Sequence, residues 1–113
     1  MGCLFCNILE KKIPADVVYE DDHALAFRDI RPVAPTHVLV IPKTHIAAIH
    51  DLEADHAVLM GQTLIAARKV AEKLGLVDDG FRLVINDGDH AGQTVHHIHV
   101  HVLGGRSLSW PPG

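Results

Sequence analysis

Aromatic residues are scarce in this chain, making up 4% of its 113 residues, whereas hydrophobic residues make up 48%. A domain of this size can bury a core, and that core must be built mainly from aliphatic side chains. Cysteine is also scarce, with only Cys3 and Cys6 present. This C-x-x-C pair, without signs of secretion, favours free thiols or a metal site over a structural disulfide.

Further absences limit the partners. The formal net charge is −4 and no run of lysine or arginine occurs, which argues against a broad nucleic-acid surface, because clustered cations bind backbone phosphates. A pocket for a small phosphorylated ligand remains open. No stretch reaches the roughly 18–20 uninterrupted apolar residues of a membrane span, and no basic segment followed by an apolar block begins the chain. We therefore predict a cytoplasmic protein that binds neither nucleic acid nor membrane.

The hydrophobic pattern predicts a single domain over residues 1–113, with 107–113 as a C-terminal tail. Residues 37–41 are β-branched and apolar, and Pro42 closes them as a central strand. The other predicted elements are a short helix over 4–12, strands over 17–20 and 24–28, a long helix over 54–74, and strands over 81–86 and 94–103. This order predicts an α+β domain with a mostly antiparallel sheet.

One face of the predicted long helix is apolar. Its residues recur at three- and four-residue spacing, and Gly75 is suited to end the helix. The residues of this face are Leu59, Thr63, Ala66, Val70 and Leu74.

Histidine is abundant, with ten residues, three of which alternate near the C-terminus. Successive residues of a strand point to opposite faces. On the predicted strand 94–103, His97, His99 and His101 therefore share one face. The other face carries Ile98, Val100 and Val102, which would pack on the core.

Three interpretations of this histidine row stay open from the residues alone. A polar sheet face can simply be solvated. A metal could bind part of the row, but three ligands in line fit one ion poorly, because the outer pair is about 13 Å apart along a strand and metal–nitrogen bonds are about 2.1 Å long. The third is nucleophilic catalysis by a neutral imidazole. Backbone amides of Gly92-Gln93-Thr94 could form an anion-binding nest just before the row, which suits phosphoryl or nucleotidyl transfer.

The segment His97-Ile98-His99-Val100-His101-Val102-Leu103 resembles the His-x-His-x-His-x-x signature of the histidine-triad (HIT) superfamily. Matches to its Hint branch, in order and spacing, cover nearly the whole chain: Asp29-Ile30, Ala34-Pro35-Thr36-His37, Ile41-Pro42-Lys43, Asn86 with Gly88, Gly92-Gln93-Thr94, and the ending Gly104-Gly105-Arg106 to Trp110-Pro111-Pro112-Gly113. The resemblance implies a HIT-like fold, a five-stranded sheet with one long and one short helix, in a homodimer whose sheets join into one.

The resemblance also implies an activity: hydrolysis of purine nucleoside phosphoramidates and acyl-adenylates, which releases the nucleoside monophosphate and requires no catalytic cofactor. His99 would be the nucleophile and would form a nucleotidyl-histidine intermediate. His97 would orient its ring, and His37 would support the triad. The α-phosphate would be contacted by His101, Asn86, Thr94 and main-chain groups near Gly92 and Val95.

By the same resemblance, the nucleoside would occupy a neighbouring pocket. Asp29 would accept both ribose hydroxyls, since a carboxylate can accept two hydrogen bonds from a cis-diol; alternatively, Asp29 caps a loop. The base would lie among apolar side chains, some of which would also belong to the core. These side chains are Leu4, Phe5, Ile8, Phe27, Ile30 and Leu39.

The chain departs from the Hint pattern at a few positions. His96 stands where an aromatic residue is usual, and it should point away from the triad face. Thr94 replaces a frequent serine and keeps the hydroxyl, and His90 is unusual in its loop. The segment Cys3-Leu4-Phe5-Cys6 resembles other bacterial HIT proteins, some of which hold a structural zinc. The matching ligands are Cys3, Cys6, His45 and His97, a suitable tetrahedral set, and the alternative is two free thiols.

Two other functions stay open. The first is a non-enzymatic nucleotide-binding or scaffold protein with a HIT fold, against which the intact set Asp29, Asn86, Thr94, His99 and His101 argues. The second is a metal-dependent hydrolase, which a chelator would inactivate. The tail 107–113 could reach the active site of the other subunit.

Overall fold

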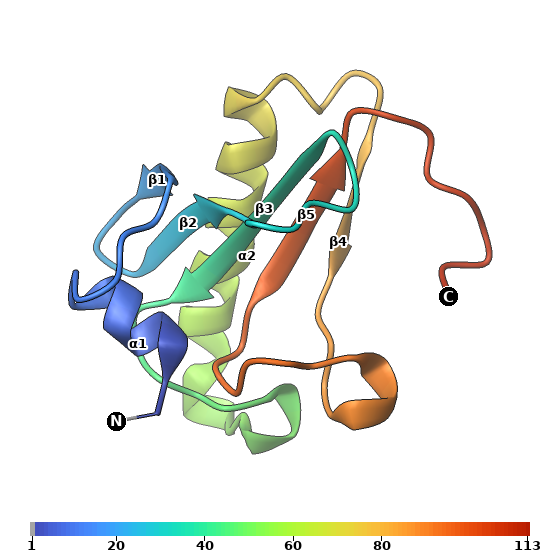
Figure 1. Ribbon diagram of the computed structural model, residues 1–113. Helices are drawn as coiled ribbons and strands as arrows, with labels where there is room; N and C mark the ends of the chain where they lie inside the picture. Colours follow the sequence, from blue (N-terminus) through green and yellow to red (C-terminus); the bar gives the residue numbers. More distant parts are fainter. Residues whose placement is uncertain (1) are drawn as a thin grey trace.

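The computed structural model describes residues 2–113 as one five-stranded sheet with a helix on each face (Figure 1). The strands pair in the order β1-β2-β3-β5-β4, and all neighbours are antiparallel. The elements are α1 (Leu4–Leu9), β1 (Val17–Glu20), β2 (Ala24–Arg28), β3 (Thr36–Pro42), α2 (Ala57–Lys73), β4 (Phe81–Val84) and β5 (Val100–Gly104), with 3-10 turns at Ile49–Asp51, Ala54–His56 and Asp89–Ala91. The predicted α+β class and antiparallel sheet are confirmed.

The central strands β2 and β3 bury both faces, and the two faces differ in side-chain size. Small side chains of β2 and β3 face α2, and large ones pack around Phe5 of α1. The α2 side of the sheet presents Ala24, Ala26, Val38 and Val40 to the alanines of the helix. The α1 side presents Leu25, Phe27, Leu39 and Ile41. Because alternate residues of a strand point to opposite faces, this alternation of small and large residues lets α2 approach closely while α1 covers a thicker apolar layer.

The long helix α2 lies behind the sheet in Figure 1 and buries the face that its sequence predicted. Its fully buried residues are Thr63, Ala66, Ala67, Val70 and Ala71, while Leu59 and Leu74 are half-buried. Gly75 follows the helix with a φ of +73°, a conformation that favours glycine and ends helices. Within residues 2–113, no helix is long and apolar enough to cross a bilayer.

Several predicted boundaries are wrong. The short helix ends at Leu9 rather than at residue 12, because Lys11 adopts a left-handed φ of +63°. The long helix begins at Ala57, after a 3-10 turn, and β4 ends at Val84 rather than at residue 86.

The largest error concerns the last strand, which begins at Val100 instead of residue 94. The backbone N–H of Ile98 donates to the carbonyl of Ile46 at 2.7 Å, outside the sheet ladder. His97 and His99 therefore precede the strand, and only His101 lies within it.

Candidate active site

A cavity of about 560 Å³ lies on the α1 side of the sheet, within the size range of roughly 300–1,000 Å³ that is common for ligand sites. Its apolar wall includes all six residues predicted to hold a base: Leu4, Phe5, Ile8, Phe27, Ile30 and Leu39. The predicted polar contributors that line it are Asp29, Thr94, His99 and His101, with Val95 beside them. The cavity is thus apolar along one wall and polar where the histidines lie.

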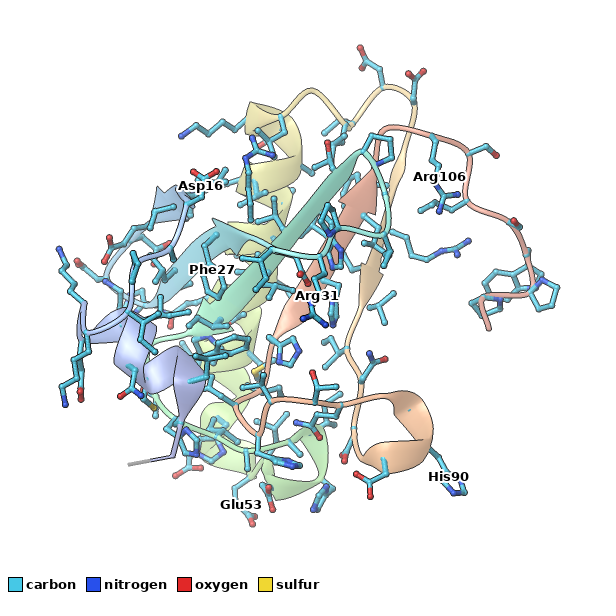
Figure 2. The ribbon with its side chains drawn as sticks, viewed as in Figure 1. Asp16, Phe27, Arg31, Glu53, His90 and Arg106 are labelled. Atoms are coloured by element: carbon cyan, nitrogen blue, oxygen red, sulfur yellow. The ribbon has the colours of Figure 1, made fainter. Side chains whose placement is uncertain are left out.

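Sequence reasoning missed part of the cavity wall, which is supplied by Ile13, Pro14, Ala15, Asp16 and Arg28. These residues come from the connection between α1 and β1 and from the end of β2. The Arg28 N–H donates to the Asp16 carbonyl at 2.9 Å, and the two side chains lie 3.6 Å apart. Figure 2 labels Asp16, which lies just before β1, and Phe27 of β2. No local motif marks this connection, because its place depends on how α1 packs.

The ring of His99 has a defined tautomer. Its Nδ1 lies 2.7 Å from the carbonyl of His97, so Nδ1 must carry the hydrogen, because a carbonyl oxygen only accepts. Nε2 then holds a lone pair. Every buried side-chain nitrogen or oxygen of residues 2–113 has a hydrogen-bond partner. Nε2 of His99 has no such partner, so this atom is not buried and is reachable from the cavity. Burial lowers the pKa of His99, which keeps the ring neutral and nucleophilic near pH 7.

His37 fixes the tautomer of His101 through a chain of hydrogen bonds. The backbone N–H of Val33 donates to Nδ1 of His37 at 3.2 Å, so the hydrogen of the neutral His37 ring is on Nε2. That Nε2–H lies 2.9 Å from Nδ1 of His101 and 3.4 Å from Oδ2 of Asp29. Because Nδ1 of His101 accepts this hydrogen bond from His37, the hydrogen of the neutral His101 ring is on its Nε2. His101 therefore offers an N–H donor next to the free lone pair of His99, whose ring centroid is 5.0 Å away.

Burial also keeps this pair of histidines neutral. Desolvation lowers the pKa of His37. Desolvation, followed by the nearby rings of His99 and His37, lowers the pKa of His101 to about 4. The opposing influence of the Asp29 carboxylate is smaller for both residues. Neutral rings are what the tautomer chain requires.

Asp29 fits both interpretations that its sequence allowed. Its Oδ1 accepts a hydrogen bond from the Arg31 N–H at 2.8 Å, which is a loop cap. Its side chain also lines the cavity and keeps lone pairs available. The carboxylate is therefore fixed in place by the loop and open to a ligand.

His97 is fully buried and does not line this cavity. Its Nε2–H donates to the carbonyl of Pro42 at 2.9 Å, which leaves the Nδ1 lone pair directed at Cys3 Sγ (3.3 Å), Cys6 Sγ (3.6 Å) and His45 Nδ1 (3.2 Å). His97 was expected to orient the ring of His99. The group that contacts this ring is the main-chain carbonyl of His97, while its side chain faces the cysteines.

The four predicted zinc ligands form one cluster. Their ligand atoms all lie within 4.8 Å of one another, with Cys6 Sγ 3.4 Å from His45 Nδ1. In a tetrahedral zinc site with bonds of about 2.1–2.3 Å, ligand atoms are about 3.3–3.8 Å apart. The distances from His97 Nδ1 to its three neighbours and from Cys6 to His45 lie in or near this range, so Cys3, Cys6, His45 and His97 could hold a tetrahedral metal ion.

The loop before the triad offers fewer free amides than the sequence suggested. The N–H groups of Gly92 and Gln93 are already bonded to the carbonyls of Asp89 and Gly88, at 3.1 Å each. This corrects the expected nest, because the 3-10 turn Asp89–Ala91 uses those donors. The N–H groups of Thr94 and Val95 have no partner in residues 2–113, and both residues line the cavity.

Asn86 and Gly92 lie outside the cavity wall. The last registered pair of β4 and β5 is Val84 with His101. Asn86 follows β4, two residues after Val84.

Comparisons with known proteins decide the family. The model of the HIT domain matches residues 10–108. The chain belongs to the HIT family. It is 48% identical over 105 residues to the purine nucleoside phosphoramidase of Escherichia coli K12, which covers 93% of this chain and 88% of that protein. It is 53% identical to an uncharacterized HIT-like protein of Synechococcus elongatus over 97% of this chain and 96% of that protein.

Solved structures of HIT proteins have the same fold. A HIT family hydrolase from Legionella pneumophila superposes with a TM-score of 0.97 at 55% identity, over 99% of this chain and 100% of that chain. A HIT family hydrolase from Clostridium thermocellum gives a TM-score of 0.92 at 45% identity, over 95% and 93%. The five-stranded sheet and the two helices are thus those of the HIT fold.

Two of the departures of this HIT chain, His96 and His90, lie away from the cavity. His96 is exposed and is not part of the cavity wall. His90 lies on the turn Asp89–Ala91 and points outward, at the far side of the loop from α1 (Figure 2). Thr94, in contrast, lines the cavity with its neighbour Val95.

Proposed function

We propose that this HIT protein is a hydrolase that cleaves purine nucleoside phosphoramidates and related nucleoside monophosphate derivatives, including acyl-adenylates. The observation that carries the proposal is the accessible Nε2 lone pair of His99, fixed by the Nδ1–H bond to the His97 carbonyl. The relative from E. coli that is named purine nucleoside phosphoramidase supports the substrate class. The intermediate would be a nucleotidyl group on His99.

The reaction follows from the proton positions. Nε2 of His99 forms a bond to phosphorus while the bond from phosphorus to the leaving amine breaks, and the amine leaves with that electron pair and takes a proton from solvent. The ring of His99 becomes cationic, and the His97 carbonyl stabilises this charge through the Nδ1–H bond. Water then attacks phosphorus, the electron pair returns to Nε2, and the water proton is released to solvent. No step draws on a metal.

The remaining site residues would bind the nucleotide. The Nε2–H of His101 and the N–H groups of Thr94 and Val95 are free donors for phosphate oxygens, and we expect the Thr94 hydroxyl and the Asn86 amide to add to them. Donors that are already positioned stabilise developing charge well in a site that excludes water. Asp29 would accept the ribose hydroxyls, and the apolar wall around Phe27 would hold the base.

We further propose that the cluster of Cys3, Cys6, His45 and His97 holds a structural zinc ion. The close set of two sulfur and two nitrogen atoms supports this proposal. Zinc bound there would tie the N-terminal segment and α1 to the segment before β5. The zinc ion would stabilise the folded state and take no part in the reaction, since His99 is not one of its ligands.

We propose that the protein is a homodimer. The strand β4 is an edge of the sheet and would pair with a second copy. The outer face of α2 exposes Val58, Leu64 and Ile65, which supports an apolar interface nearby.

The tail runs along β4, where Arg82 donates to the Ser109 carbonyl at 3.0 Å and lies 5.7 Å from the Trp110 ring. A tail at the shared edge could contact the partner's site. The cytoplasmic location stays a prediction.

The test is rapid-quench intact mass spectrometry with an adenosine phosphoramidate, for wild type, His99→Ala and His99→Gly. We expect turnover and a single nucleotidyl adduct in the wild type, and neither in the variants. The exposed residue His23 provides a matched control, because His23→Ala should behave as wild type. Adenosine monophosphate binding without turnover by the wild type would instead identify a binding protein. Loss of turnover on adding a chelator, with the thermal midpoint unchanged, would identify a metal-dependent hydrolase.

A further inference from the structure

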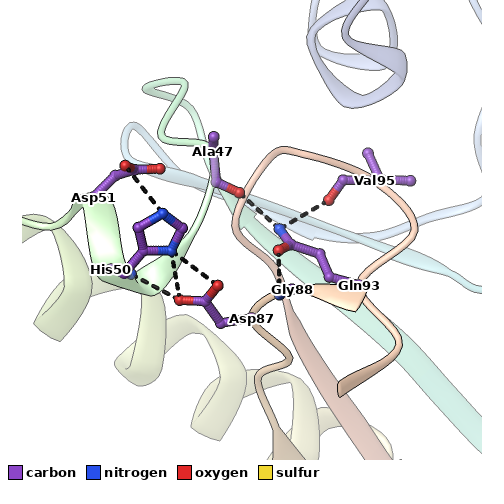
Figure 3. A network of polar contacts seen from close by, with 7 residues as sticks. All are labelled: Ala47, His50, Asp51, Asp87, Gly88, Gln93 and Val95. Carbon is purple, nitrogen blue, oxygen red and sulfur yellow. Dashed lines mark hydrogen bonds and ion pairs between the residues drawn. The ribbon is translucent and has the colours of Figure 1, made fainter. Parts of the chain in front are cut away.

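The loop between β4 and β5 carries the groups proposed to contact phosphate, and it is attached at both of its ends to one segment, residues 46–50. Figure 3 shows this network. Gln93 bonds to Ala47, and Asp87 bonds to His50. Just beyond the loop, Ile98 bonds to Ile46.

Gln93 forms the inner attachment. It is buried, and its side-chain amide makes three hydrogen bonds. Nε2 donates to the Ala47 carbonyl at 2.7 Å and to the Val95 carbonyl at 3.2 Å. Oε1 accepts from the Gly88 N–H at 3.0 Å, while the Gly88 carbonyl accepts from the Gln93 N–H. One side chain thus closes the loop on itself and joins it to the neighbouring segment.

Asp87 forms the outer attachment, directly after Asn86. Its Oδ2 accepts from the backbone N–H of His50 at 2.9 Å. Nδ1 of the His50 ring is also 2.9 Å from both carboxylate oxygens. The backbone N–H and the ring Nδ1–H of His50 therefore both hold the Asp87 carboxylate. On the other side of the ring, Nε2 of His50 lies 3.6 Å from Oδ1 of Asp51.

We propose that Asp87 and Gln93 are positioning residues, which hold the loop of residues 86–95 on segment 46–50 before the nucleotide arrives. This inference rests on the proposed function, because it assumes that Asn86, Thr94 and Val95 contact the phosphate. Neither residue lines the cavity around His99, so each acts through its neighbours. If the loop adopted its binding conformation only part of the time, the apparent affinity for the nucleotide would fall by that fraction. A loop already fixed in the binding conformation avoids this loss.

The outer attachment should also respond to pH. The hydrogen bond to Asp87, together with the charges of Asp51 and Asp87, raises the pKa of His50. Asp51 and Asp87 are the carboxylates that lie within 3.6 Å of the ring nitrogens. A raised pKa means that the ion pair is complete below the unfolded pKa of about 6.5 and is lost as pH rises through the raised value. The backbone N–H bond to Asp87 persists at every pH above the titration of the carboxylate.

The experiment compares Asp87→Ala, the conservative Asp87→Asn, and Asp78→Ala as a control at an exposed aspartate before β4. The first measurement is hydrogen exchange of residues 86–95 by mass spectrometry. The second is KM and kcat for an adenosine phosphoramidate between pH 6 and 9. Asp87→Ala should speed exchange in this loop and raise KM about two- to tenfold, since it removes hydrogen bonds to a partly exposed charge. Its kcat should stay within about twofold, because bound substrate restores the loop.

Asp87→Asn should fall between wild type and Asp87→Ala, because an amide oxygen still accepts from the His50 N–H. It should also lose any rise in KM that the wild type shows at alkaline pH. Exchange and KM of Asp87→Ala that match Asp78→Ala would overturn the proposal. Faster exchange with an unchanged KM would overturn it as well, because the attachment would then serve the fold alone. Absence of turnover in the wild type would refute the proposed function. Hydrogen exchange measured with and without adenosine monophosphate would still test the attachment of the loop. Equal exchange in Asp87→Ala and Asp78→Ala would then overturn the attachment.

Discussion

Two groups of titratable side chains lie on either side of His99, and they differ in where their hydrogens are. The first group consists of Cys3, Cys6, His45 and His97, and the second of Asp29, His37 and His101. In both groups the ligand atoms lie within 4.8 Å of one another. Distance alone would therefore make both of them metal sites.

The hydrogen bonds separate the two groups. In the first, the Pro42 carbonyl takes the Nε2–H of His97, so a lone pair points at two sulfur atoms. Converging lone pairs and ionisable thiols are what zinc requires. In the second, the Val33 N–H starts a chain in which His37 donates to His101. A metal there would have to displace a hydrogen bond. We therefore expect the first group to stabilise the structure and the second to take part in the chemistry.

The largest expected effect is on kcat, from the second group. His101→Ala removes the N–H donor beside His99, and loss of one such donor to a transition state lowers kcat about 10²- to 10³-fold. The thermal midpoint and zinc content should stay near those of the wild type. Steady-state kinetics, calorimetry and metal analysis check the three quantities. A variant that lost zinc instead of activity would reverse the assignment of the two groups.

The next effect is on stability, from the first group. Cys6→Ser should abolish stoichiometric zinc and lower the thermal midpoint by about 10 °C, because bound zinc adds roughly 2–4 kcal/mol to the folded state. The value of kcat should change far less than in His101→Ala. Metal analysis of protein purified without chelator, with zinc added back, is the measurement. Wild-type protein that takes up no zinc would leave Cys3 and Cys6 as free thiols.

A third effect concerns Asp29, which borders the second group. Asp29→Asn keeps the bond to the Arg31 N–H and removes the charge that would accept ribose hydroxyls. We expect KM for an adenosine substrate to rise at least about tenfold, because hydrogen bonds to charged groups are worth about 1.5–3 kcal/mol. The 2′-deoxy substrate should suffer less from the substitution. Equal losses for the ribo and deoxy substrates would restrict Asp29 to its capping role.

The sequence predicted the members of both groups better than it predicted the backbone that holds them. The alternation of His97, His99 and His101 was assigned to a strand, yet the strand starts at Val100. The bond from Ile98 to Ile46 bends the chain away from the ladder. Such a contact joins residues 52 positions apart along the chain, and no local pattern encodes it.

In the cavity too, the sequence predicted which residues take part better than it predicted the backbone around them. Its six apolar residues follow from the family resemblance, and all of them line it. Asp16 and Arg28 were missed because their place depends on the path between α1 and β1. The amides of Gly92 and Gln93 were overestimated as anion donors because the 3-10 turn uses them. Motifs therefore predicted residue identity, and tertiary hydrogen bonds determined which groups were free.

The smallest expected effect is the pH dependence of stability that the second group causes. Burial lowers the pKa of His37, and that of His101 to about 4. In the unfolded chain a histidine titrates near 6.5, so between these values the unfolded state binds more protons and stability falls as the pH is lowered. Denaturant unfolding followed by circular dichroism at pH 7 and 5.5 should show that His101→Gln recovers roughly 1 kcal/mol or less of this acid loss. Titration of the carboxylates is avoided by staying above pH 5. A variant with the same acid loss as the wild type would mean that His101 titrates normally, and the neutral hydrogen-bond chain from Val33 through His37 would then have no basis.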